Sequence, residues 1–134
     1  MADVEASRHQ QRERALSLLY ESELKHQEPL DVLSALPVPP DDYVRTLLQG
    51  VVDTQQEADG RIEGASVGWP LDRMAVIDRL ILRQAVAELL DPHGPPVAVV
   101  IDEAVELAKV YSTDDSGSFV NGILSTIAKD VRPA

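Results

Sequence analysis

The stretch from residue 97 to residue 131, VAVVIDEAVELAKVYSTDDSGSFVNGILSTIAKDV, gives the clearest indication of the fold class of this 134-residue chain. Its apolar side chains recur every three or four residues, which is the spacing of one face of an α-helix. These positions are Val97, Val100, Ile101, Ala104, Val105, Ala108 and Tyr111, and then Val120, Ile123, Leu124, Ile127, Ala128 and Val131. The pattern predicts two amphipathic helices. The polar loop between them, residues 112–116, has side-chain oxygens that can cap the second helix.

The same helical period recurs in the other long segments, and no segment shows the sustained alternation of a strand. We therefore predict an all-α bundle of about seven helices in one domain, residues 1–134, with two helical halves at about 8–66 and 70–134. Helices are expected over residues 8–26 and 30–36, from Asp41 or Asp42 onward, and from a cap at or near Asp72 to about Leu90. Trp69, between the two halves, is expected to be packed.

Composition excludes several classes of protein. The chain has no cysteine, so it has neither disulfides nor cysteine metal sites. No apolar run approaches the roughly 20 residues that span a bilayer, and the polar N-terminus does not resemble a secretion signal. These features predict a cytoplasmic protein. Its net charge of −11 has the wrong sign for gripping nucleic acid over a broad surface, so RNA binding would need a local basic patch or a basic partner.

Sequence motifs for catalysis are missing. His9, His26 and His93 are not at metal-ligand spacing, and the chain has neither a glycine-rich phosphate loop nor a GxSxG motif. The paired acids at 102–103 and 114–115 could suggest a site for a divalent cation. They are more simply interpreted as a solvated helix face and as a capping loop, respectively. We therefore expect no enzyme activity, no cofactor and no metal.

Four segments together resemble the NusB transcription antitermination family. They are RHQQRERALSLLYESEL (8–24), WPLDRMAVIDRLILRQAVAELL (69–90), IDEAVELAK (101–109) and DDSGSFVNGIL (114–124), in the family's order and spacing. The resemblance implies a NusB-like helical fold. It also implies a transcription antitermination factor that binds boxA single-stranded RNA together with the ribosomal protein NusE. The factor would act in an antitermination complex with RNA polymerase and support ribosomal RNA transcription.

The resemblance also implies which residues contact RNA. The first two turns of the first helix are rich in cations: Arg8, His9, Arg12 and Arg14. In the family this region contacts boxA, and Arg8 and Arg12 match the family's arginine positions, although scattered solvated arginines would look the same.

A second group of implied RNA contacts lies at the start of the last helix, where Ser118 and Phe119 fall. Phe119 could stack on a base or could instead be the first core residue of its helix. Asp115, just before them, is expected to repel phosphate and so to modulate RNA affinity.

The implied NusE contacts are Tyr20 and Asp78, which match a family tyrosine and a family acid at that interface. Two alternatives remain open. The chain could be a stand-alone helical regulatory or dimerisation domain related to the N-terminal domain of ribosomal RNA cytosine methyltransferases. It could also form a structural homodimer.

Overall fold

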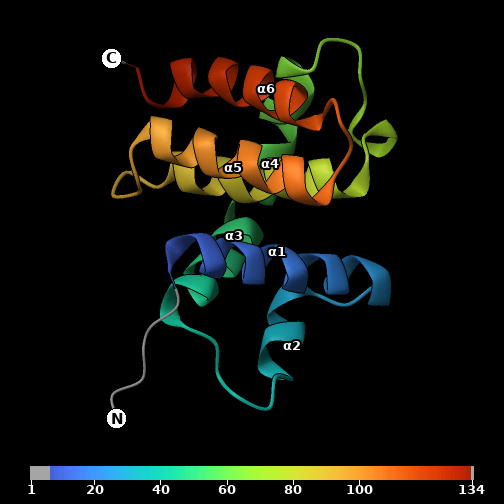
Figure 1. Cartoon of the computed structure of the whole chain (residues 1–134), viewed down its shortest axis with the longest axis vertical. Helices are drawn as coiled ribbons and strands as arrows, with labels where there is room; N and C mark the ends of the chain where they lie inside the picture. The colour runs from blue at the N-terminus through green and yellow to red at the C-terminus, as the bar shows by residue number, and fades with distance from the viewer. Residues whose placement is uncertain (1–6, 134) are drawn as a thin grey trace.

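The computed structural model describes residues 7–133, which fold entirely into helices and connecting loops (Figure 1). The elements are α1 (Arg8–Lys25), α2 (Pro29–Ser34), α3 (Asp42–Ala65), the 3₁₀ helix η1 (Leu71–Arg73), α4 (Val76–Leu90), α5 (Val97–Tyr111) and α6 (Ser116–Val131). The all-α prediction is confirmed. The predicted count of about seven is slightly high, because the described residues contain six α-helices and one turn of 3₁₀ helix.

Helix α4 lies at the centre of the bundle. It packs against α1, α3, α5 and α6, and ten of its fifteen residues are buried. A helix surrounded in this way must be apolar on nearly all sides, as the sequence LILRQAVAELL shows. The core around it is aliphatic, with fully buried side chains that include Leu18, Leu48, Ile62, Ile81, Leu82, Leu89 and Leu124.

The remaining helices form two groups around α4. Figure 1 shows α1 and α2 in the lower part of the molecule and α5 and α6 in the upper part, with the long helix α3 running between them. Helix α3 contacts α1 and α2 near its start and also packs against α4 and α6. The bundle therefore places the start of α1 and the start of α6 on different sides. None of the helices within residues 7–133 is long and apolar enough to cross a membrane.

Helix ends follow local chemistry at some positions only. The Ser7 hydroxyl accepts a hydrogen bond from the Gln10 amide at 3.1 Å, and the Gln10 side chain accepts one from the Ser7 amide at 3.0 Å. This reciprocal pair is a capping box, and it starts α1. The prediction of a helix cap at or near Asp72 is wrong, because Asp72 lies in η1 and both η1 and α4 begin without a side-chain cap.

Two residues that were predicted to be packed are exposed. Tyr111 is the last residue of α5 and is exposed, whereas Leu107, one turn earlier, is buried. The Tyr111 hydroxyl donates a hydrogen bond to Glu13 on α1 at the surface of the protein. Trp69 was expected to be packed, but 52% of its surface is exposed.

Candidate nucleic-acid interface

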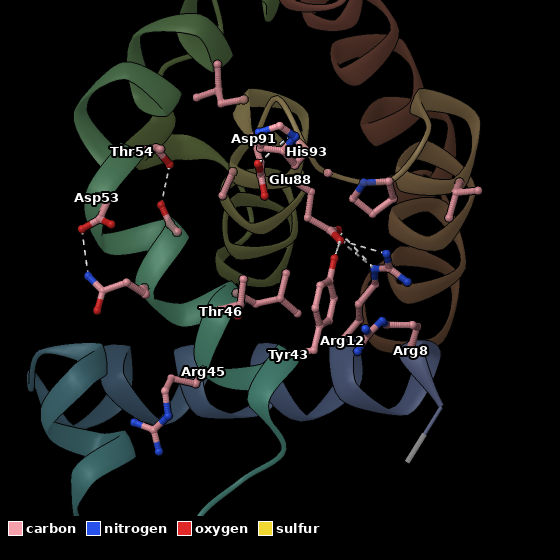
Figure 2. A pocket seen from close by; sticks show the side chains of 18 residues that line it. Arg8, Arg12, Tyr43, Arg45, Thr46, Asp53, Thr54, Glu88, Asp91 and His93 are labelled. Atoms are coloured by element: carbon pink, nitrogen blue, oxygen red, sulfur yellow. Dashed lines mark hydrogen bonds and ion pairs between the residues drawn. The ribbon is translucent and has the colours of Figure 1, made fainter. Parts of the chain in front are cut away.

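Arg8 is held at the start of α1 by two contacts. Its guanidinium carbon lies 4.0 Å from the centre of the Tyr43 ring on α3, which is a cation–π contact. Its Nη1 also donates a hydrogen bond to the Gln11 side chain at 2.6 Å. Figure 2 shows Arg8 beside Tyr43 at the base of a groove between α1, α3 and α4. The residue is exposed, so this cation is both oriented and accessible to an anionic ligand.

Arg12 occupies a different environment from Arg8. Only 3% of its surface is exposed, and its Nε and Nη2 donate to both carboxylate oxygens of Glu88 at 2.8 to 3.2 Å. The Tyr43 hydroxyl donates to the same carboxylate, as Figure 2 shows. Arg12 therefore ties α1 to α4, and its charge is neutralised inside the protein.

Tyr43 is the common neighbour of both arginines. The pKa of Tyr43 is raised far above its usual value, mainly because the phenol is buried and secondly because it donates a hydrogen bond to Glu88. The phenol therefore stays neutral and remains a donor to Glu88 at any ordinary pH. Its ring supports Arg8 on the solvent side and lies 5.6 Å from the Arg12 guanidinium.

His9 links α1 to α5. Its Nδ1 donates to Glu103 at 2.7 Å, and its Nε2 lies 3.6 Å from Glu13. The hydrogen bond to Glu103 is the main reason that the pKa of His9 is raised. Glu13 also accepts a hydrogen bond from the Tyr111 hydroxyl. His9 therefore carries more positive charge near neutral pH than a free histidine, but two carboxylates share that charge.

Arg14 is exposed and lines a separate hollow beside the loop before α3, together with Pro39 and Asp41. Arg8 instead lines a groove of about 820 Å³, whose other charged residues include Arg45 and Asp53. The first helix thus presents its two exposed arginines to different hollows rather than as one basic patch.

Ser118 and Phe119 lie in the first turn of α6. Ser118 is exposed, and Phe119 is partly buried against the hydrophobic core while also lining a small cavity. Both readings of Phe119 thus have a physical basis. Figure 1 shows the start of α1 and the start of α6 at opposite sides of the molecule, so the structure does not bring Arg8 and Arg12 together with Phe119.

Tyr20 and Asp78 lie toward the same end of the molecule, because an ion pair of 3.5 Å between Glu23 and Arg79 joins the second half of α1 to the first half of α4. Tyr20 is exposed. Asp78 is only 7% exposed, and its carboxylate accepts a hydrogen bond from the Ser112 hydroxyl at 2.5 Å. It lines the same cavity as Phe119 and Asp115.

Sequence reasoning missed Tyr43 and Glu88, which organise the start of α1. One signal was present, because Glu88 is an acid near the apolar C-terminal end of α4, and a buried acid needs a cation as its partner. Nothing in the sequence identifies Arg12, 76 positions away, as that partner.

Within residues 7–133, six α-helices pack into one bundle, and a network of paired polar side chains lies at the start of α1. The NusB family model matches residues 9–129, and the chain belongs to the NusB family.

Curated relatives cover most of the chain. The transcription antitermination protein NusB of Kineococcus radiotolerans is 41% identical over 128 residues, which are 92% of this chain and 94% of the relative. The NusB of Streptomyces avermitilis is 40% identical over 141 residues, covering 96% of this chain and 95% of that protein.

Solved structures agree with this membership. The NusB of T. maritima superposes with a TM-score of 0.87 at 34% identity, over 95% of this chain and 94% of that one. A structure of the antitermination factors NusB and NusE in complex with double-stranded RNA contains a chain that superposes with a TM-score of 0.76. The identity is 29%, over 93% of this chain and 99% of the other.

Proposed function

We propose that this protein is a transcription antitermination factor that binds boxA-type single-stranded RNA together with NusE. The proposal rests chiefly on the close match over 93% of the chain to the protein crystallised with NusE and RNA. It acts without catalysis, in the cytoplasm, within an antitermination complex with RNA polymerase that supports ribosomal RNA transcription. The relatives are antitermination proteins of similar length, which favours this function over that of a methyltransferase-related regulatory domain.

The RNA contacts are divided between direct and indirect roles. An RNA strand can reach the exposed or partly exposed side chains of Arg8, His9 and Arg14 on α1 and of Ser118 and Phe119 on α6. The buried Arg12 acts through the fold, by holding the start of α1 against α4. Asp115 is exposed at the N-cap of α6 and lowers the affinity by repelling phosphate.

The surface of this protein that binds NusE contains Tyr20 and the small exposed part of Asp78. A net charge of −11 favours the approach of a basic ribosomal protein. Asp78 is nearly buried and accepts a hydrogen bond from Ser112. The charge-reversing substitution Asp78→Lys would therefore disturb the local fold as well as the interface. Asparagine is the better test, since it removes the charge and can still accept the Ser112 hydrogen bond.

Titration calorimetry with purified NusE tests the protein side. Tyr20→Ala and Asp78→Asn should each weaken NusE binding by about tenfold, in keeping with interface residues whose truncation costs more than 1 kcal/mol. The matched control is Tyr111→Ala, which removes another exposed tyrosine from a different helix and should leave NusE affinity unchanged. Wild-type protein that shows no binding to NusE would refute the partner assignment.

Binding of labelled boxA RNA to the preformed complex with NusE tests the RNA side. Arg8→Ala should weaken binding several-fold, because it removes an oriented cation. Arg61→Ala is the control, since Arg61 is a partly exposed arginine on α3 that is paired with Glu57. Equal effects of the two changes would show that the start of α1 does not contact the RNA.

A further inference from the structure

Trp69 is presented to solvent by a bent loop between α3 and η1. Val67 and Gly68 both adopt left-handed backbone conformations, with φ of 37° and 76°. The Ser66 hydroxyl donates to the Trp69 carbonyl at 2.7 Å and lies 3.1 Å from the Glu63 carbonyl, which ties the loop to the end of α3. The loop thus holds the ring of Trp69 outside the core, and an exposed tryptophan is unusual unless it has a partner.

Trp69 and Phe119 both line a cavity of about 200 Å³ on the surface of the protein. The two aromatic residues come from separate segments, the loop after α3 and the first turn of α6. Figure 1 shows the connection between α3 and α4 beside that between α5 and α6, at the right of the molecule. The cavity is smaller than the roughly 300–1,000 Å³ of sites for drug-sized ligands, so it suits one planar ring system.

The charges around the cavity select the kind of ligand. Asp78 and Asp115 supply two carboxylates, while Arg73 supplies one guanidinium. A phosphate inside the cavity would meet net repulsion, whereas an uncharged aromatic ring would not. Arg73 is exposed and forms no ion pair with another described residue, so it is available to a phosphate just outside.

We propose that this cavity binds one unpaired nucleobase of single-stranded RNA, stacked on Trp69 and Phe119, with Arg73 beside the adjoining phosphate. This inference rests on the proposed RNA-binding function and extends it to a site that includes Trp69 and Arg73. Stacking on aromatic side chains is the usual means by which proteins hold splayed-out bases. The acids of the cavity keep the backbone outside while the base enters.

Trp69 is the only tryptophan of the chain, so its fluorescence reports on this cavity directly. The complex with NusE is titrated with short single-stranded boxA RNA and, separately, with the same RNA annealed to its complement. The single strand should quench Trp69 strongly and the duplex should not. The same titration with Trp69→Phe protein is the blank for any fluorescence from NusE.

Affinity measurements complete the test. Trp69→Ala should weaken single-strand binding by about tenfold, within the range of one lost stacking contact, whereas Trp69→Phe should bind nearly as tightly as wild type. The double change Trp69→Ala with Phe119→Ala should cost less than the sum of the single changes, because both rings hold one base. The matched control is Val38→Ala, which trims an exposed apolar side chain in another loop.

The outcomes separate this inference from the proposed function. RNA binding with no quenching and no loss in Trp69→Ala would overturn the base-binding cavity alone. A loss of NusE affinity with unchanged RNA affinity would assign the cavity to the protein interface and overturn the inference. A wild-type complex that binds no single-stranded RNA would refute the function and the inference together.

Discussion

The ion pair between Arg12 and Glu88 makes the stability of the fold sensitive to the loss of either residue. Both side chains are almost fully buried, and removing one partner from a buried pair leaves an uncompensated charge, at a cost of about 3–5 kcal/mol. Glu88→Ala should therefore lower the free energy of unfolding by about that amount, as measured by urea denaturation. The double change Arg12→Met with Glu88→Met should cost clearly less, because no charge is then left unpaired. Equal losses in the two proteins would contradict this account.

His9 makes stability depend on pH. Its pKa is raised in the folded protein, mainly by the hydrogen bond to Glu103, so folding favours the protonated form. The contribution is fully present below the unfolded pKa of about 6.5 and is lost as pH rises through the higher folded pKa. The stability difference between wild type and His9→Gln should thus be largest near pH 6 and shrink at alkaline pH. Urea denaturation at several pH values measures it, and a difference that grows with pH would contradict the assignment.

At the scale of elements, the loop from α3 to η1 contains a strained residue. Val67 has a φ of 37° and is 87% exposed, and a β-branched residue is rarely found in this region. Asparagine tolerates the left-handed conformation better, so Val67→Asn should stabilise the protein by about 1 kcal/mol. Thermal unfolding should show a higher midpoint.

Val38→Asn is the control for this loop. Val38 is also an exposed valine in a connection, but its φ is not positive. The same chemical change there should leave the midpoint unchanged. If both variants rose equally, side-chain polarity rather than backbone strain would explain the effect.

At the scale of the whole molecule, charge limits RNA binding by the isolated protein. The net charge is −11, and of the three arginines at the start of α1 only Arg8 and Arg14 are exposed. Two phosphate contacts from α1 predict a shallow salt dependence, with a slope of about −1.4 for single-stranded RNA, and Arg73 as a third contact makes the slope about −2.1. Binding should be weak alone, and both the affinity and the slope should increase with NusE present. Filter binding across a salt series measures this, and tight binding by the isolated protein would contradict it.

The negative charge of Asp115 also lowers the affinity of the protein for RNA. Asp115→Asn removes an exposed negative charge at the start of α6, so it should tighten RNA binding by up to about fivefold, as expected for a surface charge. Asp130→Asn, an exposed acid near the other end of α6, should have a smaller effect. A loss of affinity in Asp115→Asn would show that the carboxylate accepts a hydrogen bond from the RNA instead of repelling it.

The class of fold and most helix positions follow from the amino-acid sequence alone. Helix α5 begins at Val97 and ends at Tyr111, and α6 begins within the predicted polar loop, because apolar spacing and polar or proline-rich breaks act over a few neighbouring residues. The resemblance at four segments identified the NusB family, which the comparisons confirm. Helix positions depend on neighbouring residues, and family membership depends on the sum of many matches along the chain. Neither property requires knowledge of long-range contacts.

Which side chains reach solvent depends on how the helices pack in three dimensions. Arg8 and Arg12 look alike in sequence, but α4 supplies Glu88 next to Arg12 and leaves Arg8 outside on Tyr43. Trp69 was expected inside, yet the loop geometry exposes it beside Phe119. The exposure of a residue depends on which distant element packs over it, and the spacing of its own neighbours does not encode that information.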